Sequence, residues 1–135
     1  MIPLPSALWV DLIGLPWRLH GVGPEAYDCY GLLCEVMRRH TGVAPPAMIY
    51  GALVEEHQAL IAEQLPRWTP CDVGPGAGLL FRRGGSRAGE HVAIAIDDNR
   101  FLHASEDLGQ VCVSRLHGDI RSYHAFLVGA FRYAV

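Results

Sequence analysis

The chain has 135 residues, of which 50% are hydrophobic and 19% charged, and its formal net charge is −3. This length and polarity predict one globular domain over residues 1–135 and exclude a disordered chain. The near-neutral charge lacks the basic surface of a nucleic-acid binder, and no apolar run approaches the roughly 20 residues that span a bilayer, so we expect no nucleic-acid partner and no membrane span.

The N-terminus is apolar but differs from a secretory signal. No Lys or Arg precedes Arg18, whereas a signal peptide begins with a positively charged segment. The four cysteines form no CxxC pair and are too few for a disulfide scaffold. As written, the sequence predicts a protein that stays in the cytoplasm, where it is made, with reduced cysteines.

The first half of the chain predicts helices. Apolar side chains recur with helical spacing over residues 29–40, Asp28 is a suitable N-cap, and Gly42 supplies the stop. Cys29 then lies in the first turn, on the inward face of the helix. A second helix is expected from about residue 46 to residue 65.

The second half, which follows a Pro- and Gly-rich stretch at residues 66–78, predicts β-strands. The predicted strands cover residues 78–81, 91–96, 100–104, 110–114 and 123–133. Helices followed by strands predict an α+β fold, in which N-terminal helices pack on a mostly antiparallel sheet. Small and bulky residues alternate along 91–96, and we expect the helix that carries Cys29 to pack on the face of Ala93 and Ala95.

Two histidines are brought together if the turn between the second and third predicted strands has the right length. If residues 97–99 form a three-residue loop, His91 shares a face with His103 as a diagonal neighbour on the next strand. A two-residue loop would place the two imidazoles on opposite faces. The sequence Asp97-Asp98-Asn99 is a natural turn, and with the three-residue loop we predict a His91–His103 pair.

A cysteine at a helix start beside a histidine is the pattern of a thiol nucleophile. Only the thiolate attacks, and an ordinary cysteine has a pKa of about 8.5. A first-turn position and a nearby imidazolium would both lower the pKa of Cys29, and N–H groups of the same turn could form an oxyanion hole. We therefore predict Cys29 as the nucleophile, His91 as its base and His103 as the group that orients the base.

Several segments of the chain also resemble a known family. The segments are GLPWRLHG (residues 14–21), YDCYGL (27–32), HVAIAI (91–96) and RFLHA (100–104). They are similar to the motifs of the NlpC-type peptidases, whose pattern runs from a PYRWGG-like segment through D-C-[SWY]-G to HVGIY and FIHA. The resemblance extends from about residue 8 to residue 133 and implies a papain-like NlpC-type fold. It assigns the same roles to Cys29, His91 and His103. Trp17 stands where many members have a tyrosine, and Gly78 replaces the Asp of the family's GDLVFF strand.

The resemblance further implies a substrate and a setting. NlpC-type enzymes hydrolyse an amide bond in peptidoglycan stem peptides through a cysteine thioester, typically the bond between D-glutamate and the diamino acid, and no cofactor is implied. The chain looks most like the small members of phage tails, which would make tail proteins its partners and a phage-like particle its means of delivery. We expect substrate contacts at Trp17, at Tyr30 next to the nucleophile, and at Arg87 in the basic stretch before His91.

Other interpretations of these residues are open. A cysteine on an apolar helix face is often a core residue, and a histidine at a strand end often only bonds the backbone. Cys29, His91 and His103 could also hold a zinc ion, although the sequence lacks the paired spacing of a structural zinc site. At the level of function, the alternatives are a non-catalytic tail component that keeps the fold, and an amidase or acyltransferase of the same clan.

Overall fold

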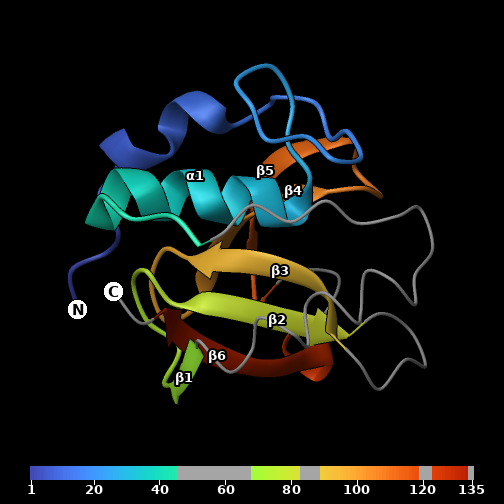
Figure 1. Ribbon diagram of the computed structural model, residues 1–135. Helices are drawn as coiled ribbons and strands as arrows, with labels where there is room; N and C mark the ends of the chain where they lie inside the picture. The colour runs from blue at the N-terminus through green and yellow to red at the C-terminus, as the bar shows by residue number, and fades with distance from the viewer. Residues whose placement is uncertain (46–67, 83–88, 119–122, 134–135) are drawn as a thin grey trace.

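The computed structural model describes residues 1–45, 68–82, 89–118 and 123–133 of the chain. Within these ranges the chain forms one α-helix, three short 3-10 helices and a β-sheet (Figure 1). The helical elements are η1 (Ser6–Leu8), η2 (Val10–Leu12), α1 (Cys29–Thr41) and η4 (Tyr123–Phe126). The strands are β1 (Trp68–Cys71), β2 (Gly78–Arg82), β3 (Gly89–Ala95), β4 (Arg100–Ser105), β5 (Gln110–Arg115) and β6 (Leu127–Tyr133). No helix in the described ranges is long and apolar enough to cross a membrane.

The strands form one sheet in the order β1-β6-β2-β3-β4-β5, and every neighbouring pair is antiparallel. The mostly antiparallel sheet is therefore confirmed. Its last strand is shorter than predicted, because Tyr123–Phe126 forms a 3-10 helix before β6. The four-residue strand β1, which contains Pro70, was not predicted. Pro lacks the N–H donor that an interior strand requires, and β1 avoids this loss by lying at the edge of the sheet.

The helix α1 begins and ends where the sequence indicates. Its N-cap is Asp28, whose carboxylate accepts a hydrogen bond from the backbone N–H of Gly31 at 2.6 Å. At the other end, Gly42 has a φ of 82°, the left-handed conformation that glycine adopts without strain. The helix predicted over residues 29–40 is confirmed, whereas the second predicted helix, at about 46–65, lies outside the described residues.

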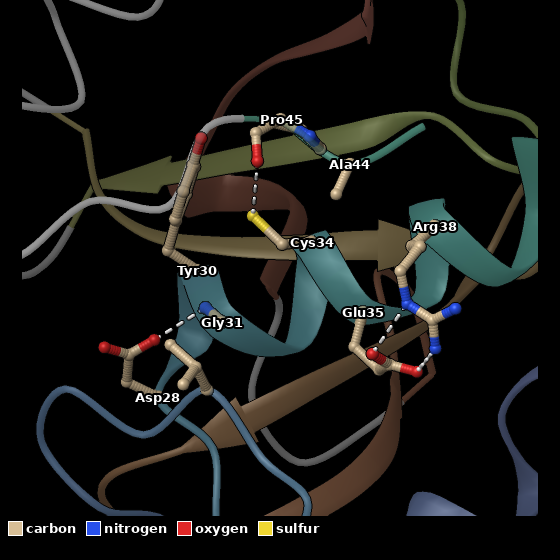
Figure 2. A pocket seen from close by; sticks show the side chains of 9 residues that line it. Asp28, Tyr30, Gly31, Cys34, Glu35, Arg38, Ala44 and Pro45 are labelled. Carbon is tan, nitrogen blue, oxygen red and sulfur yellow. Dashed lines mark hydrogen bonds and ion pairs between the residues drawn. The ribbon is translucent and has the colours of Figure 1, made fainter. Parts of the chain in front are cut away.

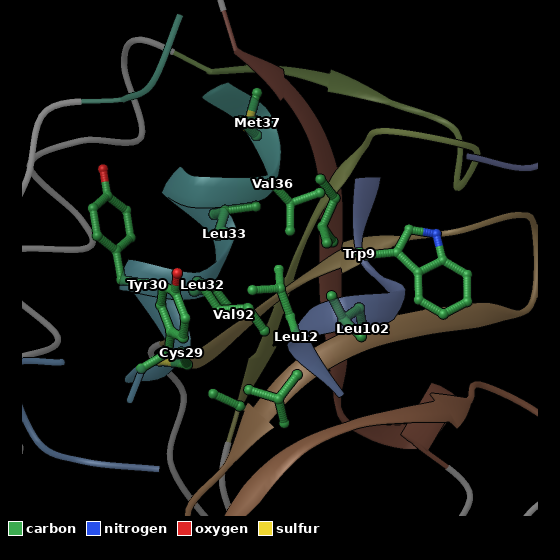
Figure 3. Close-up of a cluster of buried hydrophobic side chains, with 14 of the residues drawn as sticks. Trp9, Leu12, Cys29, Tyr30, Leu32, Leu33, Val36, Met37, Val92 and Leu102 are labelled. Atoms are coloured by element: carbon green, nitrogen blue, oxygen red, sulfur yellow. The ribbon is translucent and has the colours of Figure 1, made fainter. Parts of the chain in front are cut away.

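The helix α1 packs on the opposite face of the sheet from the one predicted. Leu33 of α1 belongs to one core cluster with Val92 and Leu102, on the bulky face of β3 and β4 (Figure 3). The small residues of β3, such as Ala93, pack instead in a second cluster with Phe101. The prediction was wrong because the alanines leave room for aromatic rings from neighbouring strands, while branched side chains fill the space under the helix.

The N-terminal segment is tied to both the sheet and α1. The backbone N–H of Leu4 donates to the carbonyl of Ile96 at 2.7 Å. Arg39 of α1 bridges Asp11 of this segment and Glu35 of its own helix, with nitrogen–oxygen distances of 2.7 Å to each. The hydrogen bond from Arg39 lowers the pKa of the Asp11 carboxyl. These contacts tie the last turn of α1 to the N-terminal segment, and that segment to the sheet.

Candidate active site

The turn between β3 and β4 has the three-residue length on which the histidine pair depends. Asp97, the first residue of the turn, stabilises it. The Asp97 carboxylate accepts hydrogen bonds from the backbone N–H groups of Asn99 and Arg100 at 2.9 and 2.7 Å. Ile94 accordingly lies opposite Leu102 in the two strands. This register puts residues 91 and 103 on one face of the sheet.

The two histidines predicted to pair are in direct contact. His91 Nε2 lies 2.8 Å from His103 Nδ1, and the two rings meet edge to face with centroids 5.1 Å apart. His91 is half-buried, whereas His103 is almost fully enclosed. The pair predicted from the turn length is therefore confirmed.

The surroundings of His103 keep its ring uncharged. The rings of Phe101 and Tyr123 have their centroids 4.8 and 5.7 Å from that of His103, and His103 Nε2 lies 2.9 Å from Ser114 Oγ. Burial lowers the pKa of His103 from 6.5 to about 4. At neutral pH the ring therefore carries a single N–H, so one of its nitrogens donates and the other accepts.

Acid should destabilise the protein through His103. With a pKa of about 4 in the folded state and 6.5 in the unfolded state, this imidazole binds more protons when the chain unfolds. The free energy of unfolding therefore rises with pH in this window, and the loss from pH 6.5 down to about 4 should be roughly 3 kcal/mol. The variant His103→Asn, which does not titrate, should lose less, as urea unfolding at a series of pH values would measure.

A matched control for this experiment is His40→Asn, because His40 lies exposed near the end of α1. It should keep the acid sensitivity of the wild type. A His103→Asn protein that is as acid-sensitive as the wild type would contradict a buried, neutral imidazole.

Cys29 is the first residue of α1, and its sulfur meets the backbone of β3 at Val92. Only 5% of the residue is exposed. Burial raises the pKa of the thiol to about 12, although the backbone N–H groups of Val92, Tyr30 and Cys29 itself lower it. The expectation of a lowered pKa is therefore wrong for the resting protein, because the position that brings N–H groups to the sulfur also removes it from water. Val92 directly follows His91 in β3, so the thiol contacts the strand that carries its predicted base.

A close approach of two backbone segments fixes the start of α1. The N–H of Asp28 donates to the carbonyl oxygen of Gly21 at 2.9 Å. A Cβ on Gly31 would overlap that same carbonyl oxygen and would lie 3.0 Å from Asp28 Oδ1. Only glycine fits at this position of the D-C-Y-G motif. The motif and the preceding GLPWRLHG segment therefore meet at the first turn and together place Cys29.

The structure describes two of the three residues predicted to contact substrate. Trp17 is half-buried and bridges to the backbone of Tyr27, two residues before Cys29. Tyr30 is only 4% exposed. Arg87 lies outside the described residues. All three roles in substrate binding stay predictions.

A pocket of about 220 Å³ lies beside α1 (Figure 2). Its lining comprises Val22, Asp28, Tyr30, Gly31, Cys34, Glu35, Arg38, Ala44 and Pro45. The Cys34 thiol donates to the Pro45 carbonyl at 3.6 Å, and burial raises the pKa of this thiol to about 12. Neither Cys29 nor the histidine pair lines this pocket. Tyr30, the residue after Cys29, therefore borders a space distinct from the histidine pair.

The departure from the family pattern at position 78 has a steric explanation. A Cβ on Gly78 would lie 2.8 Å from the ring of Trp68. Trp68 belongs to β1 and packs edge to face against Tyr133, with ring centroids 5.0 Å apart. The edge strand that the sequence analysis missed thus accounts for the glycine.

Ser114, which contacts His103, was not predicted as part of the site. Cys112 pairs with His103 in the register of β4 and β5, and its sulfur lies 3.5 Å from His103 Nε2. Ser114 lies two residues farther along the same face of β5. The alternation of β5 could have pointed to both residues, but only if the register with β4 had been known.

The zinc alternative finds no support in the described part of the chain. Within residues 1–45, 68–82, 89–118 and 123–133, no three side chains of His, Cys, Asp or Glu are grouped closely enough to hold a metal ion.

Comparison with known proteins agrees with the motifs. The NlpC/P60 family matches residues 14–130 of the chain. A curated protein of Escherichia coli (strain K12), named murein DD-endopeptidase MepS/murein LD-carboxypeptidase, is 29% identical over 106 residues, which are 78% of this chain and 50% of that protein. The chain thus spans about half the length of this relative.

Solved structures share the fold. A Staphylococcus aureus protein of the NLP/P60 family, described as similar to a lipoprotein, has a TM-score of 0.68 at 22% identity, covering 95% of this chain and 39% of that one. The NlpC/p60 domain of the peptidoglycan hydrolase SagA has a TM-score of 0.63 at 22% identity and covers 94% of both chains. Together with the match along the sequence, these similarities establish that the chain belongs to the NlpC/P60 family.

Proposed function

We propose that this protein is a cysteine peptidase that hydrolyses an amide bond in peptidoglycan stem peptides. The observation that carries the proposal is the 2.8 Å contact between His91 and His103, because His91 lies on β3, the strand whose Val92 backbone bonds the Cys29 sulfur. A thiol, a base and a group that orients the base make up a cysteine nucleophile. The Escherichia coli relative is a murein endopeptidase by its name, which supports the substrate class.

The neutral thiol determines how the proposed reaction begins. With a pKa of about 12, Cys29 holds its proton at neutral pH, so the proton passes to His91 as the sulfur bonds to the substrate carbonyl carbon. His91 Nε2 faces His103, which leaves Nδ1 to take this proton. His91 then protonates the amide nitrogen, the carbon–nitrogen bond breaks and a thioester remains. Water attacks the thioester while His91 takes its proton, and His91 returns that proton to the sulfur as the acid leaves.

Two sets of groups would stabilise the charges that develop in this reaction. The backbone N–H groups of Cys29 and Tyr30 lie at the sulfur and would donate to the substrate oxyanion, in a site that excludes water. The indole N–H of Trp17 is a further donor, in place of the tyrosine of many family members. On the other side, neutral His103 would accept a hydrogen bond from the imidazolium of His91.

Digestion of purified peptidoglycan tests the proposal. The wild type should release fragments, and Cys29→Ala should release none above background, because the nucleophile is gone. The variant Cys71→Ala, in edge strand β1, is the matched control and should act like the wild type. Release by Cys29→Ala at the wild-type rate would exclude the thioester. An inactive wild type would favour the non-catalytic alternative.

Mass analysis of the released fragments identifies the bond that is cut. We propose the bond between D-glutamate and the diamino acid, because the motifs resemble enzymes that cleave it. Cleavage at the DD or LD bonds named for the Escherichia coli relative would overturn this finer assignment while leaving the peptidase activity intact.

The proposed setting is a phage-like particle that carries the enzyme to the cell wall after its synthesis in the cytoplasm. The support is the resemblance of the motifs to those of small phage-tail members of the family. Mass spectrometry of purified particles should detect the protein among tail proteins. Its recovery only from cell extracts would contradict this setting.

A further inference from the structure

A chain of polar side chains continues beyond the histidine pair into β5. His91 Nε2 lies 2.8 Å from His103 Nδ1, and His103 Nε2 lies 2.9 Å from Ser114 Oγ. Ser114 is 8% exposed. Among the described residues, the polar side-chain atoms at His103 Nε2 are Ser114 Oγ and the Cys112 sulfur, the latter at 3.5 Å. The hydroxyl of Ser114 is thus the nearest partner of the inner nitrogen of His103.

The location of the protons in this chain decides whether His91 can act as a base. When His91 has taken a proton, both of its nitrogens carry hydrogen, so Nε2–H must donate to Nδ1 of His103. The buried His103 is neutral and has one N–H, which must then lie on Nε2. That N–H donates to Ser114 Oγ. In the opposite tautomer, His103 would donate to His91 Nε2 and oppose its protonation.

Ser114 can accept this hydrogen bond because its own proton has another partner. A hydroxyl accepts and donates at the same time, and a hydrogen bond from Ser114 lowers the pKa of the Cys112 thiol, which burial otherwise raises. Without the hydroxyl, the Cys112 sulfur at 3.5 Å would be the remaining side-chain acceptor, among the described residues, for a buried N–H on His103 Nε2. Sulfur accepts only weakly, and weakening a buried hydrogen bond is unfavourable, so the ring would change to the opposite tautomer.

We propose that Ser114 is a positioning residue that holds His103 in the tautomer with the proton on Nε2, and thereby keeps His91 competent as a base. The kinetic effect that we expect rests on the proposed peptidase function. The effect on the tautomer of His103 does not, because that tautomer can be observed in the free protein.

A pair of nearly isosteric variants isolates the hydroxyl. Ser114→Thr keeps the acceptor, and Ser114→Val has almost the same shape without it. We expect Ser114→Val to lower kcat by about 10- to 100-fold at nearly constant KM. This is the size of effect expected when a residue that orients the reacting imidazole through a second residue is lost. Ser114→Thr should restore most of this loss. Ser105→Ala removes another buried serine hydroxyl of the neighbouring strand, one that bonds the backbone N–H of Leu108, and should keep the wild-type kcat.

Two further measurements distinguish positioning from a merely structural role. The acid limb of the kcat/KM profile should move to lower pH in Ser114→Val, because the opposite tautomer disfavours the imidazolium of His91. The nitrogen chemical shifts of the His103 ring should show the proton on Nε2 in the wild type and on Nδ1 in Ser114→Val. A wild-type ring with its proton on Nδ1, or equal kcat values for the threonine and valine variants, would overturn the proposal.

The outcomes also separate this inference from the proposed function. If the wild type cleaves no peptidoglycan, the function fails, and the ring shifts still decide the role of Ser114. If the wild type cleaves it and the valine variant keeps both its rate and its His103 tautomer, the function stands and the role of Ser114 fails. If Ser114→Val does not fold, Ser114→Ala removes the same hydroxyl without added bulk and is compared with Ser114→Thr in its place.

Discussion

Replacing His91 by alanine is expected to lower kcat by about 10²- to 10⁴-fold at neutral pH, the contribution of a general base. The buried thiol makes this base necessary. With a pKa of about 12, Cys29 on its own would be thiolate in only about one molecule in 10⁵ at neutral pH. His91 removes the proton during attack, so without it the reaction depends on this small fraction.

The pH dependence of His91→Ala provides the sharpest measurement. A higher pH increases the thiolate fraction as long as the pH stays below the thiol pKa. The kcat/KM of the variant should therefore rise by roughly tenfold per pH unit through the alkaline range, where the wild type reaches a plateau. Steady-state hydrolysis of a stem-peptide substrate would measure both profiles.

The control for this experiment is His40→Ala, which removes an exposed histidine near the far end of α1. It should follow the wild-type profile. A His91→Ala enzyme that keeps the wild-type rate and plateau would assign the base to another group, and His103 would then be the first residue to test.

Replacing Gly31 by alanine should destabilise the fold by about 3 kcal/mol or more, the sum of overpacking and of a lost N-cap. Elsewhere in a helix interior the same change is stabilising, because alanine is the better helix former. Here the new Cβ would overlap the carbonyl oxygen of Gly21 and crowd the Asp28 carboxylate, which caps the helix. The first turn and the segment before it would have to separate.

Urea unfolding followed by circular dichroism measures this loss. The matched control lies at the other end of the same helix, where Gly42 has a φ of 82° and no atom within 4 Å of a Cβ. Gly42→Ala should cost only about 1 to 2 kcal/mol, from backbone strain alone. Equal losses for the two variants would contradict the close approach at Gly31.

The amino-acid sequence alone determined the features that depend on neighbouring residues. The bounds of α1 follow from Asp28 as N-cap, from Gly42 as stop and from the helical spacing between them. The contact between His91 and His103 follows from a three-residue turn, because the period of two along a strand lets the turn length decide which side chains share a face. The motifs likewise indicated the family to which the chain belongs.

The features that the sequence could not determine arise where distant segments meet and where water is excluded. Which face of β3 receives α1 depends on how bulky side chains from several elements fill one space, so alternation alone could not decide it. The raised pKa of Cys29 comes from its enclosure between α1 and the sheet, which a first-turn position does not reveal. Ser114 reaches His103 only through the register of β4 and β5. In each case the tertiary structure decided, because burial and strand register depend on contacts between residues far apart in the chain.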